Sequence, residues 1–145
     1  MASLVEYNRC KMSEPLTIYL AKADESLLGA QSEVDQGRYN NAANRCYYAC
    51  FQAAIAALQQ ANISSPGGRE EWGHAFVQAA FVGQLINRRK FYSPGLRQVL
   101  ARNLTLRHKA DYTGDLVTQR QAERAVQRTR ELLAAIREKV NGHQE

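Results

Sequence analysis

The sequence predicts an all-α fold, an up-and-down bundle of four long helices with about five helices in total. Apolar residues recur at helical spacing, and no stretch alternates apolar and polar residues for long enough to propose a sheet. Helix start and stop signals stand at the borders of these periodic stretches. With 145 residues, 45% of them hydrophobic and 23% charged, the chain has the length and composition of one globular domain.

The first helix is expected to begin at Ser13, an N-cap residue with Pro15 in the turn that follows. It should end near Gly37, because glycine is the usual residue just past a helix end. Residues 1–12 are then expected to form a flexible leader, or to precede a natural start at Met12.

The second helix is expected from about Tyr39 to Ala61 and is apolar around most of its circumference, which predicts that it lies at the centre of the bundle. Its few polar residues fall on one narrow line at helical spacing. These residues are Asn41, Arg45, Tyr48 and Gln52. Such a stripe on an otherwise apolar helix indicates that these polar residues are directed at a specific contact.

A third helix is expected from about Gly73 to Arg88, and a fourth opens at Ser93-Pro94, where proline favours the first helical turn. The residues of the third helix expected to face inward are Phe76, Ala79, Ala80, Gly83 and Ile86. His74, one residue into this helix, is interpreted as a capping or surface residue.

The last helix is expected to begin at Thr118, whose spacing to Gln121 makes a capping box, and to run to about Val140. The bundle domain is therefore assigned to residues 13–141, with a tail over residues 142–145.

The fourth helix carries two polar residues on its core-facing line. Counting from Leu96, the periodicity calls for apolar side chains where Asn103 and Arg107 stand. A charged guanidinium cannot be buried without partners. Arg107 is therefore expected to pair with a carboxylate or a tyrosine inside the bundle, or to line a cleft that receives an anion. Asp111 follows one turn later, with Tyr112 beside it.

The net charge of +5 is distributed unevenly. Residues 1–71 hold six basic and eight acidic side chains, whereas residues 72–145 hold thirteen basic and six acidic ones. Seven basic residues and no acidic one lie between Trp72 and Ala110. This run favours a polyanionic partner. The alternative is that these cations are solvated helix faces.

Several other classes of protein find no support. No apolar run approaches the roughly 20 residues needed to span a bilayer, so no membrane association and a cytoplasmic location are expected. Cys10, Cys46 and Cys50 are interpreted as reduced thiols, because the close pair is spaced i, i+4 and not as a metal knuckle. No metal and no cofactor are predicted, since no phosphate-binding glycine loop or ligand spacing is present.

Two segments resemble the HEPN family of helical domains, which bacteria and archaea often pair with minimal nucleotidyltransferases. Residues 42–51, AANRCYYACF, are similar to the family's pattern of small residues, arginine, two aromatics and phenylalanine. Residues 107–112, RHKADY, are similar to the arginine-to-ADY signature of a small-HEPN subfamily, which also tends to have a histidine and an aromatic where His74 and Phe76 stand. The resemblance covers about residues 14–140.

The resemblance implies a C2 homodimer in which the fourth-helix motifs of both subunits converge on one cleft. Ribonucleases of the family use an arginine, four to six intervening residues and a histidine. Counted from Arg107, the histidine position is held by Tyr112. A second register pairs Arg102, followed by Asn103, with His108. In a regular helix this pair is about 120° apart and needs a kink or the partner subunit to converge.

Three functions remain open. The first is a HEPN protein that binds a nucleotide or RNA in the dimer cleft and acts with a minimal nucleotidyltransferase. The second is a metal-independent ribonuclease toxin of a toxin–antitoxin pair, with Arg102 or Arg107 and with His108 as catalytic residues. The third is an interaction bundle that binds no ligand. The expected nucleotide- or RNA-binding residues are Arg45, Tyr48, Asn103, Arg107, Asp111 and Tyr112.

Overall fold

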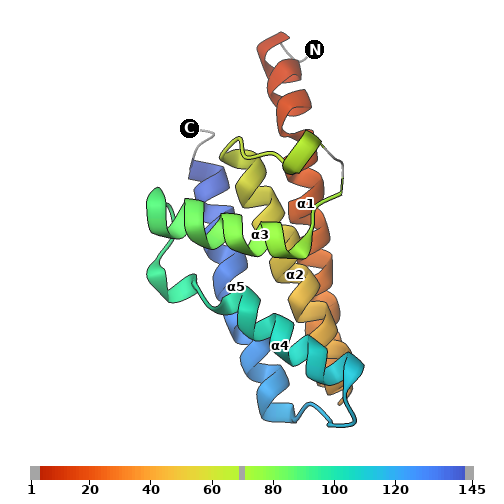
Figure 1. Cartoon of the computed structure of the whole chain (residues 1–145). Helices are drawn as coiled ribbons and strands as arrows, with labels where there is room; N and C mark the ends of the chain where they lie inside the picture. The colour runs from red at the N-terminus through yellow and green to blue at the C-terminus, as the bar shows by residue number, and fades with distance from the viewer. Residues whose placement is uncertain (1–3, 69–70, 143–145) are drawn as a thin grey trace.

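The computed structural model describes residues 4–68 and 71–142, and for residues 4–17 it describes the backbone alone. The helical elements are α1 (Leu4–Asp35), α2 (Tyr39–Gln60), η1 (Pro66–Gly68), α3 (His74–Ala80), η2 (Phe81–Arg88), η3 (Pro94–Leu96), α4 (Val99–Tyr112) and α5 (Gln119–Gly142). The described residues form no strand, so the prediction of an all-helical bundle of five helices is confirmed. Figure 1 shows α1, α2 and α5 along the length of the molecule, with α3 and α4 crossing them.

The second helix lies at the centre, as predicted, because it packs against α1, α3, α4 and α5. Its buried side chains are small over most of its length, and alanines at Ala42, Ala43, Ala49 and Ala53 have no exposed surface. Small side chains let neighbouring helices approach closely, so α2 can contact four helices at once.

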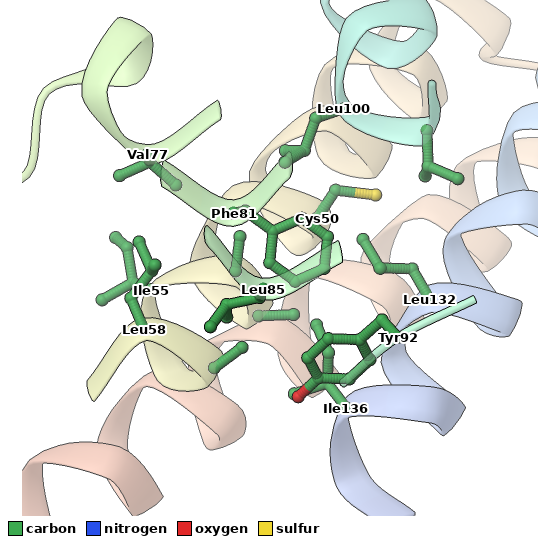
Figure 2. Packing of buried hydrophobic residues seen from close by; sticks show 14 of the residues in the cluster. Cys50, Ile55, Leu58, Val77, Phe81, Leu85, Tyr92, Leu100, Leu132 and Ile136 are labelled. Atoms are coloured by element: carbon green, nitrogen blue, oxygen red, sulfur yellow. The ribbon is translucent and has the colours of Figure 1, made fainter. Parts of the chain in front are cut away.

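The larger hydrophobic cluster lies at the end of the bundle where α3 crosses. Figure 2 shows Phe81 and Leu85 of η2 packed among Ile55 of α2, Leu132 and Ile136 of α5. A second cluster of buried residues joins α1, α2, α4 and α5. The burial of apolar surface is the main stabilisation of such a bundle, and each Å² of it contributes about 25 cal/mol. The two clusters fix the positions of α2 and α4, which carry most of the polar residues considered below.

The predicted start of the first helix is wrong. The helix begins at Leu4, so Ser13 lies inside it and is not its N-cap. Residues upstream of Ser13 are mostly good helix formers, and their propensity outweighs a cap signal. The structure gives helical backbone from Leu4, whereas residues 1–3 of the predicted leader lie outside the described residues. The predicted end is confirmed: α1 stops at Asp35, and Gly37 has a φ of +76°.

The inward face predicted for the third helix is also wrong in part. Ala79 is exposed and Gly83 is half-buried, whereas Val77, Phe81 and Leu85 are buried. The segment Phe81–Arg88 is π-helical. Ala80 and Ile86 are buried as predicted, and the π-helical segment adds Phe81 and Leu85 to the buried side.

The capping box of the last helix is confirmed. The backbone N–H of Gln121 donates to Thr118 Oγ1 at 3.1 Å, and the N–H of Thr118 donates to Gln121 Oε1 at 3.0 Å. The helix continues to Gly142, so the first residue of the predicted tail is helical, and residues 143–145 lie outside the described residues. No helix in the described part of the chain is long and apolar enough to cross a lipid bilayer.

Candidate functional site

Arg107 faces α2, as its position on the core line predicts. Its side chain is 17% exposed, and its guanidinium carbon lies 5.3 Å from the ring centroid of Tyr47 and 5.1 Å from that of Tyr48. A guanidinium over an aromatic face is attracted by the negative charge of the ring face. The arginine is thus partly desolvated but not unpaired.

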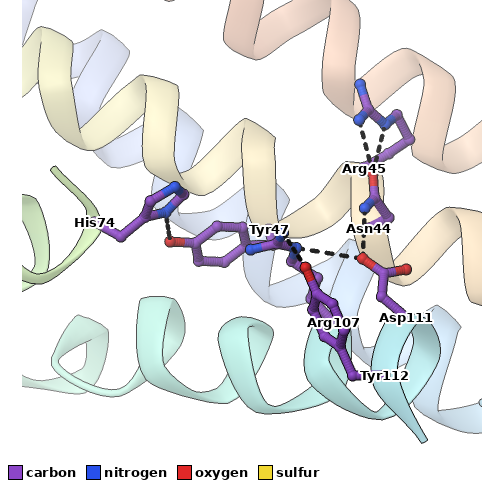
Figure 3. Close-up of polar contacts among 7 residues, drawn as sticks. All are labelled: Asn44, Arg45, Tyr47, His74, Arg107, Asp111 and Tyr112. Atoms are coloured by element: carbon purple, nitrogen blue, oxygen red, sulfur yellow. Dashed lines mark hydrogen bonds and ion pairs between the residues drawn. The ribbon is translucent and has the colours of Figure 1, made fainter. Parts of the chain in front are cut away.

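Carboxylate and hydroxyl groups complete the surroundings of Arg107. Its Nε donates to Asp111 Oδ2 at 3.3 Å, and its Nη2 donates to the Tyr112 hydroxyl at 3.5 Å. Asn44 donates to the same Asp111 oxygen at 2.9 Å and accepts from Arg45 Nη2 at 2.7 Å (Figure 3). The predicted pairing of Arg107 with a carboxylate and a tyrosine is confirmed.

The set formed by these residues is called the Arg107 cluster from here on. Its members are Asn44, Arg45, Tyr47, Tyr48, His74, Arg107, Asp111 and Tyr112. Arg45 also lies over the ring of Tyr48, with its guanidinium carbon 5.2 Å from the ring centroid. Asp111 is ion-paired with Arg107, whereas Arg45 reaches it only through Asn44. The two guanidinium groups on Tyr48 therefore leave an excess positive charge beside an aromatic ring.

His74 joins the cluster from the start of α3. Its Nδ1 is hydrogen-bonded to the Tyr47 hydroxyl, and its ring stacks on Phe51 with centroids 4.4 Å apart. Burial lowers the pKa of His74 below its ordinary value of 6.5, and the nearby charge of Arg107 lowers it further. Burial raises the pKa of Tyr47 to about 12, against the opposing effect of Arg107. At neutral pH both groups are therefore uncharged, and the Tyr47 hydroxyl can donate to the imidazole.

The sequence alone did not place His74 in this cluster. It lies 27 residues from Tyr47 in the chain, and only the packing of α3 on α2 brings the two together. The one available signal for a role of His74 was the resemblance to a subfamily that tends to have a histidine at this position. The prediction of a surface position is nevertheless confirmed, because His74 is exposed while it bonds to Tyr47.

Asn103 lies apart from the Arg107 cluster. It has no exposed surface, and its amide donates to Thr129 Oγ1 at 2.9 Å and to Cys50 Sγ at 3.0 Å, while its Oδ1 accepts from Arg128 Nε at 2.7 Å. Burial raises the pKa of the Cys46 thiol to about 11 and that of Cys50 to about 12. Asn103 thus links α2, α4 and α5 in the core and meets no solvent through which a ligand could approach.

The predicted catalytic pair does not converge within one subunit. Arg102 lines a groove of about 570 Å³ between α4 and α5, whose lining does not include His108. His108 is exposed, with its ring centroid 5.4 Å from that of Tyr112. The regular helix keeps the two side chains on different sides, as their spacing predicts.

The polar stripe of α2 is divided among several contacts. Asn41 donates to Glu33 of α1 at 3.5 Å, and Gln52 shares a hydrogen bond of 2.8 Å with Ser26 of α1. Arg45 and Tyr48, the middle members, belong to the Arg107 cluster. The ends of the stripe therefore hold helices together, and its centre forms the candidate site.

Comparison with known proteins identifies the family of the chain. A protein of Methanocaldococcus jannaschii named "Putative toxin MJ0605" is 28% identical over 113 residues, which cover 76% of this chain and 77% of that relative. The model of the HEPN domain family matches residues 17–139, a range that contains both fourth-helix and second-helix motifs. The chain therefore belongs to the HEPN domain family.

Proposed function

We propose that this chain is a HEPN protein that binds RNA or a nucleotide at the Arg107 cluster, in the cleft of a homodimer, and acts with a minimal nucleotidyltransferase. The observation that carries the proposal is the pair of guanidinium groups on the ring of Tyr48: Arg107 is ion-paired with Asp111, whereas Arg45 bonds to the neutral amide of Asn44. An anion is the ligand that such an excess of positive charge attracts.

The chemistry of the cluster suits a nucleotide. Arginine binds phosphate oxygens through parallel N–H donors, and Arg45 is exposed enough to supply them. Tyr112 is 66% exposed and offers an aromatic face on which a base can stack. Phosphate contacts and base stacking together are typical of proteins that bind single-stranded RNA.

The exposed apolar surface beside the cluster supports the homodimer. Tyr112 is 66% exposed, and Leu116, in the loop after α4, is 74% exposed. Large apolar side chains gathered at one place on a surface are typical of an interface. A second subunit that covers them brings its own α4 to the cluster, in keeping with the dimer cleft that the family resemblance implies.

Binding is tested by titrating fluorescent ATP and a labelled 12-nucleotide RNA with wild-type protein, Arg107→Gln and Arg137→Gln. Arg137 is a matched control, because it loses the same charge and its ion pair with Asp24 lies on the surface of α1 and α5. We expect Arg107→Gln to weaken binding about tenfold, the loss of roughly one charge-assisted hydrogen bond, and the control to bind like wild type. Equal binding by all three proteins contradicts the proposal.

The dimer is tested by size-exclusion chromatography with light scattering, which measures the mass of the protein in solution. Wild type is expected at twice the mass of the chain. Leu116→Asp buries a charge in the proposed interface, leaves the face of Tyr112 unchanged and should shift the protein to the monomer. A wild-type monomer at micromolar concentration overturns the dimer cleft.

A second candidate function is a metal-independent ribonuclease toxin. It is favoured by the name of the relative, a putative toxin, and by the contact between His74 and Tyr47 close to Arg107. Cleavage by the RNA 2′-hydroxyl needs a general base. In the tautomer in which Nδ1–H of His74 donates to the Tyr47 hydroxyl, the neutral imidazole can accept the proton at Nε2. Arg107 would stabilise the negative charge that develops on the phosphorus oxygens.

Incubation with total RNA in EDTA separates the candidates. Cleavage abolished by His74→Ala but not by His108→Ala identifies the Arg107 cluster as the catalytic site. Cleavage abolished by His108→Ala favours Arg102 and His108 from different subunits. Intact RNA throughout, together with RNA binding, supports the binding protein. If the protein neither binds nor cleaves RNA, the remaining function is that of an interaction bundle, in which Arg107 and Asp111 form a structural ion pair.

A further inference from the structure

The groove between α4 and α5 lies apart from the Arg107 cluster and is strongly basic. Its lining residues are Gln98, Ala101, Arg102, Thr105, Leu106, Lys109, Gln121, Arg124 and Arg128. Four of these side chains are cationic, two from each helix, and no carboxylate lines the groove among the residues that the structure describes. Arg102 and Arg107 are five residues apart, or about 140° around α4, so the groove and the cluster face different sides of that helix.

The cations of the groove are not neutralised by the protein. The three ion pairs found among the side chains of residues 18–68 and 71–142 use Arg38, Arg107 and Arg137. Lys109 donates to the neutral amide of Gln121 at 3.0 Å, and Arg128 donates through Nε to Asn103 at 2.7 Å. The groove therefore keeps its full positive charge.

This arrangement costs stability in the absence of a ligand. Arg124 and Arg128 are four residues apart on α5, and like charges at this spacing repel each other. Burial lowers the pKa of Arg128, and the charge of Arg102 on the facing helix lowers it further. An anion between the two helices removes this repulsion, whereas solvated cations on an ordinary helix face would spread apart.

We infer that the α4–α5 groove binds the phosphate backbone of an RNA strand, which rests on the proposed function and extends it to a second contact surface. From Arg102 to Lys109 the cations extend over seven residues, or about 10 Å of helix. A strand in a stacked, duplex-like conformation, with one phosphate per roughly 3.4 Å along its axis, covers this length with about three nucleotides. A single phosphate is too short to contact them all.

The groove contacts the backbone and not the bases. No aromatic side chain belongs to its lining, so it offers no platform on which a base can stack. Binding through phosphate contacts alone is independent of sequence and positions the strand. The Arg107 cluster, with its tyrosines, is the place where a base of the same RNA can be held.

The test uses the whole protein and a fluorescein-labelled 12-nucleotide uridine RNA, followed by anisotropy at several salt concentrations. The groove variant is Arg102→Gln/Arg124→Gln, which leaves Arg128 and its contact with Asn103 intact. The matched control is Arg88→Gln/Lys90→Gln, which removes the same charge from exposed residues at the end of η2 and just after it. Thermal melting of both variants checks that they fold.

The groove variant should bind RNA roughly tenfold more weakly than wild type, and its salt slope should fall by about 1.4, since each lost contact with a single strand contributes about 0.7. The control should keep most of the affinity and the slope. If the groove variant binds like the control while Arg107→Gln loses binding, the groove inference is overturned and the proposed function stands.

The other outcomes are equally separable. Loss of binding in the groove variant with full binding by Arg107→Gln supports the groove and contradicts the proposed site. Two further probes are ATP and an acidic peptide of twelve glutamates. If ATP occupies the groove as tightly as the RNA, or if the peptide binds there and the RNA does not, the assignment to an RNA backbone is overturned.

Discussion

The guanidinium of Arg107 lies 5.1 Å from the ring centroid of Tyr48, which joins the end of α4 to the middle of α2. The same guanidinium contacts Asp111 and Tyr112 on its own helix. The arginine therefore has two roles: it stabilises the helix packing, and it contributes positive charge to the candidate site.

Arg107→Lys keeps the charge but loses the planar guanidinium, which lies over the rings of Tyr47 and Tyr48. The guanidinium also bonds to the carboxylate of Asp111 and the hydroxyl of Tyr112. We expect the substitution to lower the free energy of unfolding by about 1 kcal/mol. Urea denaturation measures the change. Arg137→Lys, whose exposed ion pair with Asp24 contributes little, is the control and should stay within about 0.5 kcal/mol of wild type. If Arg107→Lys lowers the free energy of unfolding by less than about 0.5 kcal/mol, the packing role of Arg107 is contradicted.

Asn103→Ala removes the amide that links three helices. It leaves the Nε of Arg128 without its acceptor in the core and removes one of the hydrogen bonds of Thr129, which keeps its bond to the carbonyl of Ala125. We expect a loss of about 2–3 kcal/mol in the free energy of unfolding, because unsatisfied buried polar groups add to the cavity. The slope against urea should be unchanged if the fold is kept. A loss below about 1 kcal/mol shows that Asn103 is not a structural link.

His74 makes stability depend on pH. Its pKa in the folded protein is lowered by burial and by Arg107, so the unfolded chain takes up a proton more readily as the pH falls below about 6.5. This contribution to stability is complete above pH 6.5 and is lost as the pH falls toward the folded-state pKa. His74→Phe keeps a stacking ring without the titration. Between pH 7.5 and 5, its melting temperature should fall less than that of wild type. Equal slopes would contradict this origin of the pH dependence.

Thr118→Ala removes half of the capping box at the start of α5. We expect a loss of about 1 kcal/mol, because the N–H of Gln121 loses its acceptor. Thr105→Ala is a suitable comparison, since Thr105 is exposed and its hydroxyl bonds only to the carbonyl of Ala101 one turn earlier. The free energy of unfolding of Thr105→Ala should not decrease. Chemical denaturation of both variants decides the matter.

Local signals in the sequence predicted the ends of several helices correctly. Gly37 marks the end of α1, because glycine adopts a positive φ without strain. Thr118 and Gln121 mark the start of α5 through a hydrogen-bond pattern that involves neighbours only. Ser13 failed as a start signal because a helix can continue through a capping residue when the residues before it also favour helix.

The candidate site was predicted in part. The inward direction of Arg107 follows from the period of one helix, and Asp111 lies within its reach at i, i+4. The same reasoning directed Asn103 inward but could not tell a ligand-binding amide from a buried structural one. That distinction depends on Thr129 and Arg128, which α5 supplies.

The sequence by itself determined the helical fold, most helix borders and the residues of α4 that face the core, since each depends on periodicity or on neighbours within one turn. Only the tertiary structure decided which residues meet across helices: His74 with Tyr47, Arg107 with Tyr48, and the four cations of the α4–α5 groove. Periodicity gives the direction of a side chain on its own helix. The crossing of helices far apart in the chain gives its partner, and the small buried side chains of α2 let four helices approach it closely.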